Sequence, residues 1–300
     1  MDPMVIGASG LVGGASLAAL RRAGYEAYGT YRTRHREGLI PWDSKRGPES
    51  LTYDEYDLNP LVLASALTNV DYCEAHPAEA EEQNVHLVKG LVEWCEKYSR
   101  PMVFFSSDYV FDGRDGPYAE NAPVHPLNVY GRTKLAAEAL VLSLERSVVI
   151  RITNVFDIGF EDRNFVHRCV THLRDRLPLI VPADQFATPT YATWLADQWV
   201  TLLKGGAILE RESPRILNAG CDEVVSRGEL ARRIAARLGA DASLIEERPT
   251  AELNQAAARP LRGGLRNDLW KRLLGVERLS LDDALDDCLP RMLALYESRP

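Results

Sequence analysis

Cysteines are few in this chain and follow no recognisable pattern. The five cysteines are odd in number and lack a Cys-x-x-Cys spacing. The sequence therefore predicts neither a disulfide framework nor a zinc site, and we expect no bound metal. We expect the cysteines to be buried free thiols in the reducing cytoplasm.

Long apolar runs and an excess of basic residues are also missing. No stretch of about eighteen apolar residues is present, so no membrane span is expected. The first residues lack a basic region followed by an apolar stretch, so we expect no signal peptide and a cytoplasmic protein. The net charge of −8 disfavours nucleic acid as a main partner. An anionic ligand would need a local basic pocket.

The first 150 residues alternate short apolar runs with longer stretches of helical spacing. Strand-like runs and helix-like stretches follow one another as MVIGAS, LVGGASLAALRRAG, YEAYGTYR, LVLASA, PAEAEEQNVHLVKGLVEWCEKY, PMVFFSS, NVYGRTKLAAEALVLSL and SVVIRITNVF. Alternating β and α units predict a parallel sheet with helices on both faces. The fold class expected is α/β, with a Rossmann-type doubly wound parallel sheet and a smaller C-terminal lobe.

A glycine-rich turn follows the first predicted strand. Gly7, Gly10 and Gly13 are spaced by three and open the first predicted helix. Glycines there let backbone amides approach a pyrophosphate at the positive end of a helix. The spacing differs from G-x-G-x-x-G. A phosphate-binding turn and a plain tight turn both remain open from these residues alone.

The end of the second predicted strand favours NADPH over NADH. An NAD site usually places an acid about 20 residues beyond the glycines to bind the ribose hydroxyl. The corresponding region, GTYRTRHRE, has no acid before Glu37, whereas Arg32 and Arg34 could face a 2′-phosphate. A solvated basic loop is the alternative.

A tyrosine and a lysine four residues apart mark a candidate active site. Tyr130 and Lys134 share one face of a predicted helix. A nearby ammonium favours the phenolate, so we expect Lys134 to lower the pKa of Tyr130 and to make it a better acid and base. Ser106 and Ser107 lie at the carboxyl end of the strand before this helix, where open α/β sheets bind ligands. An exposed pair and capping serines are the alternative interpretation.

The pattern changes after about residue 154. Residues 178–203 are expected to form a loop followed by a helix, Ser226 and Glu229 predict a capped helix, and a last amphipathic helix should run from Leu281 to about Tyr296. We expect residues 1–153 to form an NADP-binding domain. Residues 154–300 should be mainly a substrate-binding lobe, with about 190–218 returning to the sheet.

Seven segments, which span nearly the whole chain, together carry a family resemblance. They are GASGLVG, ALTNVDYCEAHPAEAEEQNV, SSDYVFDG, PLNVYGRTK, RITNVF, TPTYATWLAD and ARPLRGGLRN. With them, the sequence resembles an extended short-chain dehydrogenase/reductase, and more narrowly the dTDP-4-dehydrorhamnose reductase family. The short first strand and a shortened loop between Ser107 and Tyr130 differ from that family and leave the sugar open.

The resemblance implies roles for individual residues. It implies that Ser107 orients the keto oxygen, that Tyr130 donates the proton, and that Lys134 binds the nicotinamide ribose. The other residues expected to bind the cofactor are Gly7, Ser9, Gly10, Leu11, Val12, Gly13, Arg32, Asp57, Leu58, Ala64, Ser65 and Ala66. The residues expected at the substrate are Ser107, Asp108, Val110, Asn154, Arg259 and Arg262.

The residues beside Ser107 narrow the expected reaction. Ser107-Asp108-Tyr109 lacks the glutamate of sugar dehydratases, and no Cys and His pair suggests an epimerase-reductase. We therefore expect an NADPH-dependent reductase of a nucleotide-activated 4-keto-deoxysugar, with NADH left open as the cofactor. The alternatives are an NAD-dependent sugar-nucleotide epimerase and a regulatory subunit resembling methionine adenosyltransferase β. A monomer and a homodimer are both left open.

Overall fold

A seven-stranded sheet forms the centre of the computed structural model, which describes residues 2–51, 58–158 and 164–297. Every strand pair in this sheet is parallel. Across the sheet the strands follow the order β3 (Ile40–Pro41), β2 (Tyr28–Tyr31), β1 (Asp2–Ile6), β4 (Leu58–Leu63), β5 (Met102–Ser107), β6 (Ser147–Ile152) and β9 (Ile216–Asn218). The predicted α/β class with a doubly wound parallel sheet is confirmed.

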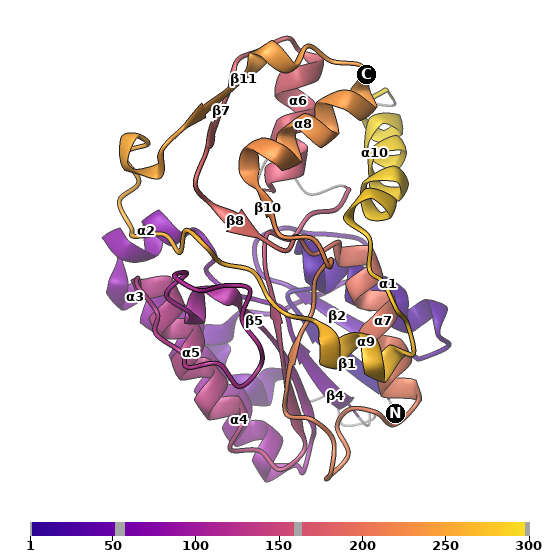
Figure 1. Cartoon of the computed structure of the whole chain (residues 1–300). Coiled ribbons are helices and arrows are strands. Elements are labelled where there is room, and N and C mark those ends of the chain that lie inside the picture. The colour runs from indigo at the N-terminus through magenta and orange to yellow at the C-terminus, as the bar shows by residue number, and fades with distance from the viewer. Residues whose placement is uncertain (1, 52–57, 159–163, 298–300) are drawn as a thin grey trace.

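The helices lie on both faces of this sheet and in a lobe above it (Figure 1). In chain order they are α1 (Leu11–Arg22), α2 (Val70–Ala75), α3 (Pro77–Glu81), α4 (Leu87–Lys97), α5 (Val129–Val141), α6 (Phe165–Arg174), α7 (Ala192–Lys204), α8 (Arg227–Leu238), α9 (Asp268–Leu274) and α10 (Leu281–Glu297). The stretch predicted as one helix from Pro77 to Tyr98 is interrupted by a π-helical turn over Glu82–His86.

Two hydrophobic cores lie on opposite faces of the sheet because side chains alternate along each strand. Val5 and Val103 point into the core shared with α1, α7 and α9. Their neighbours Met4, Ile6 and Phe104 point into the core shared with α4 and α5. Strands buried on both faces need continuous apolar runs, which is why MVFFSS could be recognised as a central strand.

The strand order places a ligand-binding crevice in the middle of the sheet. The chain runs outward from β1 to β2 and β3, then crosses to β4 and continues through β5 and β6 to β9. The direction of winding therefore reverses between β1 and β4. Open α/β sheets bind ligands outside the carboxyl ends of the strands at such a reversal.

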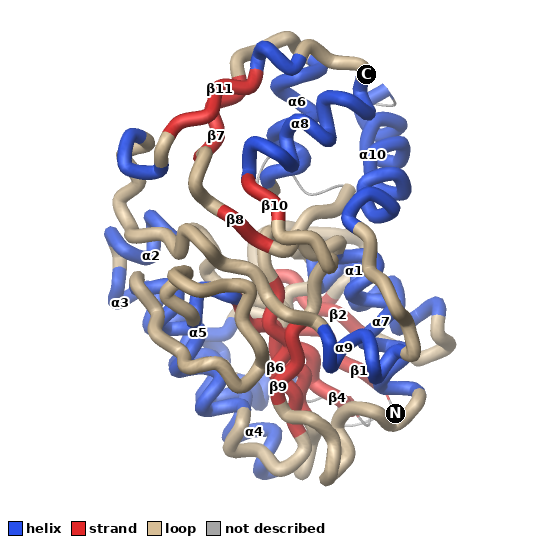
Figure 2. The backbone as a smooth tube through the Cα atoms, in the orientation of Figure 1, coloured by secondary structure: helices blue, strands red, loops and turns tan. Residues whose placement is uncertain are grey.

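A small lobe covers this end of the sheet (Figures 1 and 2). It contains α6, α8 and α10 together with β7 (Leu179–Pro182), β8 (Phe186–Ala187), β10 (Val225–Ser226) and β11 (Ile245–Arg248). The lobe has its own hydrophobic core. Its capped helix α8 is confirmed, since the Glu229 amide donates to the Ser226 hydroxyl at 3.0 Å.

The loop predicted around residue 180 is wrong, because this segment contains β7 and β8. Each of these strands is short and pairs with a segment distant in sequence: β7 with β11 and β8 with β10. Local periodicity does not reveal such pairs. All five cysteines are buried free thiols, as expected. Among the described residues, no helix combines the length and apolar character that a membrane crossing requires.

Candidate active site

The turn after β1 approaches its surroundings too closely for side chains. Gly7 has a φ of +85°, and a Cβ on it would lie 2.9 Å from the Cβ of Ser65. A Cβ on Gly13 would lie 2.3 Å from the carbonyl oxygen of Gly7. Gly10 is the N-cap of α1 and provides no side-chain cap, which leaves the first amides of α1 available to an anion.

The other residues predicted in this turn surround the start of α1. Ser9, Leu11 and Val12 are partly buried there. The Gly7 amide donates to the Thr30 hydroxyl of β2 at 3.1 Å, which attaches the turn to the neighbouring strand. The structure thus gathers this predicted group at one place, at the carboxyl end of β1.

The loop after β4 lies against the glycine turn. Ala64–Ala66 are partly buried, and Asn84 holds the loop by accepting from the Leu67 amide at 2.8 Å and donating to the Leu67 carbonyl at 3.0 Å. Asn84 belongs to the π-helical turn and is almost fully buried. Sequence reasoning missed Asn84. It could have been found as a polar residue on the buried face of an amphipathic helix.

The residues predicted to contact the adenosine of the cofactor do not form one group in the structure. Arg32 is exposed, and its guanidinium donates to the Gln83 side chain at 3.0 Å. Arg34 is partly buried nearby in the sequence. Leu58 begins β4, and Asp57 lies outside the described residues. Arg32 forms no ion pair with an acid of the described residues.

Ser107 and Tyr130 meet at the carboxyl end of β5. Ser107 is the last residue of β5, and Tyr130 lies in the first turn of α5. Burial raises the pKa of the Tyr130 phenol, and a hydrogen bond with Ser107 partly opposes this effect. The phenol ring packs edge-on against Tyr109, with centroids 5.6 Å apart. Burial therefore keeps the phenol protonated at neutral pH.

A glycine inside the tyrosine motif permits this contact. A Cβ on Gly131 would lie 2.2 Å from the carbonyl oxygen of Tyr109, so α5 could not approach this closely with any other residue there. The Asn128 side chain caps α5 by accepting from the Gly131 amide at 2.8 Å. The Glu74 carboxylate accepts from the Val129 amide at 2.8 Å. Three contacts thus fix the turn that carries Tyr130.

Lys134 does not act on Tyr130 as the sequence suggested. Its ammonium donates to the Phe105 carbonyl at 2.6 Å and lies 4.0 Å from the centroid of the Phe104 ring. Burial lowers the pKa of Lys134 to about 7, and burial raises the pKa of Tyr130 where a lowered value was expected. The expected acidification of the phenol is therefore wrong. A spacing of four residues places two side chains on one face of a helix, but it does not determine which groups the ends of those side chains contact.

Asp108 is a buried carboxyl group beside Ser107. One of its oxygens accepts from the Thr153 hydroxyl at 2.7 Å and from the Gly264 amide at 3.4 Å, and the other accepts from the Ser107 hydroxyl at 3.3 Å. Burial raises the pKa of Asp108, and these hydrogen bonds oppose that shift. Asp108 therefore joins the ends of β5 and β6 to the 263–264 turn.

The remaining residues predicted at the substrate are dispersed. Val110 is fully buried in a cluster with Phe111. Arg259 forms an ion pair with Asp71 at 2.7 Å, and only 8% of its side chain is exposed. Arg262 is exposed.

Asn154 instead contacts an arginine that sequence reasoning did not select. Asn154 directly follows Thr153 and has a φ of +43°. Its side-chain oxygen accepts a hydrogen bond from Arg227, the first residue of α8. The only sequence signal for Arg227 was its place after the N-cap Ser226.

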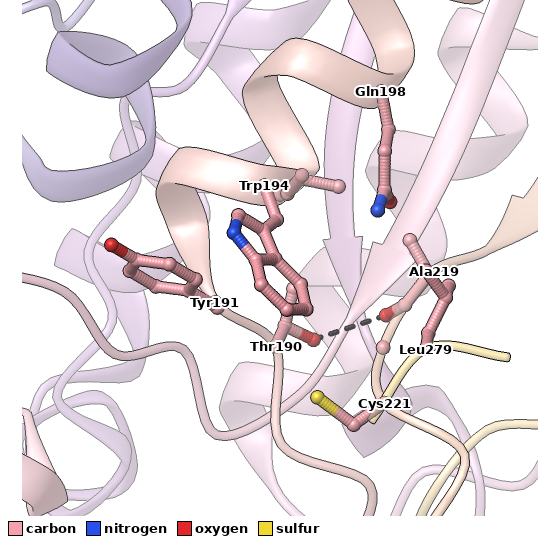
Figure 3. A pocket seen from close by; sticks show the side chains of 9 residues that line it. Thr190, Tyr191, Trp194, Gln198, Ala219, Cys221 and Leu279 are labelled. Atoms are coloured by element: carbon pink, nitrogen blue, oxygen red, sulfur yellow. Dashed lines mark hydrogen bonds between the residues drawn. The ribbon is translucent and has the colours of Figure 1, made fainter. Parts of the chain in front are cut away.

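A separate pocket lies behind the end of β6 (Figure 3). It lies between α7 and the chain that follows β9, and its lining includes Trp194, Gln198 and Cys221. The Thr190 hydroxyl at its edge donates to the Ala219 carbonyl at 3.0 Å. None of the residues predicted for catalysis or binding lines this pocket.

Comparison with curated proteins yields reductases that match almost end to end. A Haloferax volcanii protein named probable low-salt glycan biosynthesis reductase Agl14 is 30% identical, with 95% of this chain and 96% of the relative covered. The dTDP-4-keto-6-deoxy-D-glucose reductase of Streptomyces niveus is 31% identical, with 89% of each chain covered. These relatives confirm the prediction of an oxidoreductase.

Solved structures show the same fold. A hypothetical dTDP-4-dehydrorhamnose reductase from Sulfolobus tokodaii superimposes with a TM-score of 0.83 at 26% identity, over 95% of this chain and 99% of that one. The dTDP-4-dehydrorhamnose reductase of Bacillus anthracis in complex with NADP gives 0.81 at 22% identity, over 97% and 99%. The family model described as the RmlD substrate binding domain matches residues 1–294, and the chain therefore belongs to this family, as the resemblance predicted.

Proposed function

We propose that this protein is an NADPH-dependent reductase of a nucleotide-activated 4-keto-deoxysugar. The observation that carries the proposal is the meeting of Ser107 and the buried Tyr130 at the end of β5, two strands away from the glycine turn after β1. Both lie where doubly wound sheets bind ligands. The Streptomyces niveus relative is named for a substrate of this class.

The glycine turn suits a dinucleotide pyrophosphate. The backbone occupies the space that Cβ atoms on Gly7 and Gly13 would need, and the amides at the start of α1 have no side-chain cap. We propose that this turn and Ala64–Ala66 hold the cofactor. When bound, NADPH would supply the hydride for reduction. The Bacillus anthracis neighbour is in complex with NADP, and we assign Arg32 to the 2′-phosphate.

Tyr130 is assigned as the proton donor. A group that donates a proton must be protonated in the resting site, and burial raises the pKa of this phenol. As the ketone carbon accepts hydride, its oxygen becomes an alkoxide that takes the phenolic proton. The proton on Tyr130 is thereby transferred, and the phenolate left behind is reprotonated from solvent.

Ser107 is assigned to hold the keto oxygen of the substrate, and Asp108 is assigned to orient the Ser107 hydroxyl. The Ser107 hydroxyl is buried and donates to Asp108 at 3.3 Å, a weak contact that a better acceptor could replace. The neighbouring Ser106 hydroxyl is buried and has no hydrogen-bond partner among the described residues. Lys134, whose ammonium stands close to the end of β5, is assigned to the nicotinamide ribose.

The test is reduction of a panel of nucleotide 4-keto-sugars with NADPH, followed by the loss of NADPH absorbance. The panel should include dTDP-4-dehydrorhamnose, dTDP-4-keto-6-deoxyglucose and a UDP-linked ketosugar. We expect steady NADPH consumption with at least one of them. An enzyme that interconverts the sugars without net NADPH consumption, or that acts on none, would overturn the proposal.

A further inference from the structure

Helix α8 follows β10 in the small lobe above the sheet (Figure 1), and Arg227 is the first residue of α8. Its amide donates to the Gln185 carbonyl next to β8 at 3.2 Å. Its guanidinium donates to the Asn154 side chain and lies 4.6 Å from the centroid of the Phe165 ring. Arg227 therefore joins α8, the start of α6 and the chain that leaves β6.

Among the described residues this guanidinium has no acidic partner, unlike the other arginines of α8. Arg232 pairs with Glu247, and Arg233 and Arg237 both pair with Asp282. Arg227 forms no ion pair with a carboxylate of the described residues. Its side chain is partly buried, and burial lowers the pKa of the guanidinium.

A second positive charge lies on the same aromatic ring. Arg168 stands 5.5 Å from the centroid of Phe165 and electrostatically lowers the pKa of Arg227. Two guanidinium groups around one ring repel each other unless an anion compensates them. A partly buried charge without an acidic partner costs stability, and such a cost is usually retained where the charge serves binding.

Asp108, an acidic residue near Arg227, already accepts hydrogen bonds from other groups. Arg227 lies near the carboxyl end of β5, because its partner Asn154 directly follows Thr153, whose hydroxyl donates to Asp108 at 2.7 Å. The Asp108 oxygens, however, accept from Ser107, Thr153 and the Gly264 amide. Asp108 is therefore a neighbour of Arg227 and not its ion-pair partner.

We propose that Arg227, oriented by Asn154, binds the diphosphate of the nucleotide-sugar substrate. This inference rests on the proposed function and assigns the diphosphate to neither Arg259 nor Arg262, the two arginines expected at the substrate. Arg259 is occupied by Asp71, and Arg262 is exposed. The Arg227 side chain presents several donors and uses one on Asn154, so others are available for phosphate oxygens. The sugar ring would then extend from Arg227 toward Ser107 and Tyr130.

The test measures binding of dTDP and of thymidine by calorimetry, for the full chain and for Arg227→Gln. Loss of a charge-assisted contact to phosphate should weaken dTDP binding by about tenfold or more. Thymidine, which lacks the phosphates, should bind equally to both proteins. Arg227→Lys should recover part of the dTDP affinity, since a lysine keeps the charge but not the planar fork. Arg232→Gln on the same helix is the matched control and should bind dTDP like the wild type.

Thermal unfolding separates a binding role from a structural one. Removing a partly buried charge that has no acidic partner among the described residues should leave the melting temperature of Arg227→Gln unchanged or raised, whereas loss of a structural contact would lower it. Added dTDP should raise the melting temperature of the wild type more than that of the variant.

The outcomes also separate this inference from the proposed function. If the wild type reduces a ketosugar nucleotide and Arg227→Gln keeps its KM and its dTDP affinity, the diphosphate site is elsewhere and the reductase proposal stands. If the variant unfolds at a lower temperature and loses thymidine and dTDP binding alike, Arg227 is structural. If the wild type binds neither dTDP nor UDP and consumes no NADPH, both proposals fail.

Discussion

The sheet domain contains an ion pair in its interior, whereas the ion pairs of α8 in the small lobe are partly exposed. Arg151 and Glu138 pair at 2.7 Å between β6 and α5, with 3% and 2% of their side chains exposed. In the lobe, Arg232 and Glu247 are 51% and 30% exposed.

The comparison indicates where chemistry is built into this molecule. Burial shifts the pKa values of Asp108, Tyr130 and Lys134, all at the carboxyl end of β5. Such shifts concentrate at functional sites because they set which groups hold protons at neutral pH. In the lobe, most arginines of α8 are solvated partners of nearby acids, and Arg227 is the exception that resembles the sheet domain.

The largest expected effect comes from removing the phenol at the centre of the sheet-domain site. Tyr130→Phe should lower kcat by about 100-fold to 10,000-fold, because the alkoxide loses its proton donor. NADPH affinity should remain nearly unchanged. Steady-state kinetics with the ketosugar found in the panel and a fluorescence titration with NADPH measure the two quantities.

The matched control for this substitution is Tyr98→Phe, at an exposed tyrosine on the C-cap of α4. This variant should retain wild-type kinetics. Full turnover by Tyr130→Phe would remove its role as proton donor.

The two ion pairs test the comparison most directly. Glu138→Gln leaves the buried Arg151 charge unpaired and should cost about 3–5 kcal/mol of unfolding free energy. Glu247→Gln, at the exposed pair with Arg232, should cost at most about 1 kcal/mol. Urea denaturation of both variants gives the difference. Equal costs would show that burial does not separate the two regions.

Lys134 should make stability depend on pH. Its pKa is about 7 in the folded chain, against an ordinary value of 10.5. Between these two pH values the unfolded chain binds more protons than the folded chain. Burial of the Lys134 ammonium therefore lowers the unfolding free energy in full below pH 7, and this loss diminishes as the pH rises toward 10.

The pH dependence can be isolated with a neutral variant. The unfolding free energy of the wild type minus that of Lys134→Met should rise across this window. The same difference with Lys89→Met, an exposed lysine of α4, should stay flat. A flat difference for Lys134→Met would show that this ammonium is not desolvated.

The smallest effect is expected at Arg262. Its side chain is exposed, so Arg262→Gln should change the unfolding free energy by less than about 0.5 kcal/mol. The KM of Arg262→Gln for the ketosugar should match that of the wild type, since the diphosphate is assigned to Arg227. A raised KM for Arg262→Gln would return this residue to the substrate site.

Much of the sheet domain could be predicted from local patterns. Apolar runs such as MVFFSS, and the glycine turn, can be recognised from a few neighbouring residues, because strand burial and helix starts depend on adjacent residues. Ser107 and Tyr130 could be placed together because strand ends and helix starts meet at one edge of a parallel sheet. The lobe resisted prediction since β7 and β11 pair over more than 60 residues of sequence.

The amino-acid sequence alone determined the fold class, the family and the residue types at the catalytic end of β5. These depend on periodicity and on motifs whose members lie within a few residues of one another. Only the tertiary structure decided where charged side chains point. The Lys134 ammonium donates to a backbone carbonyl and Arg259 pairs with Asp71. Arg227 donates to Asn154 and forms no ion pair with an acid of the described residues. The end of a long side chain follows the charges brought near it by distant segments, and no local pattern encodes them.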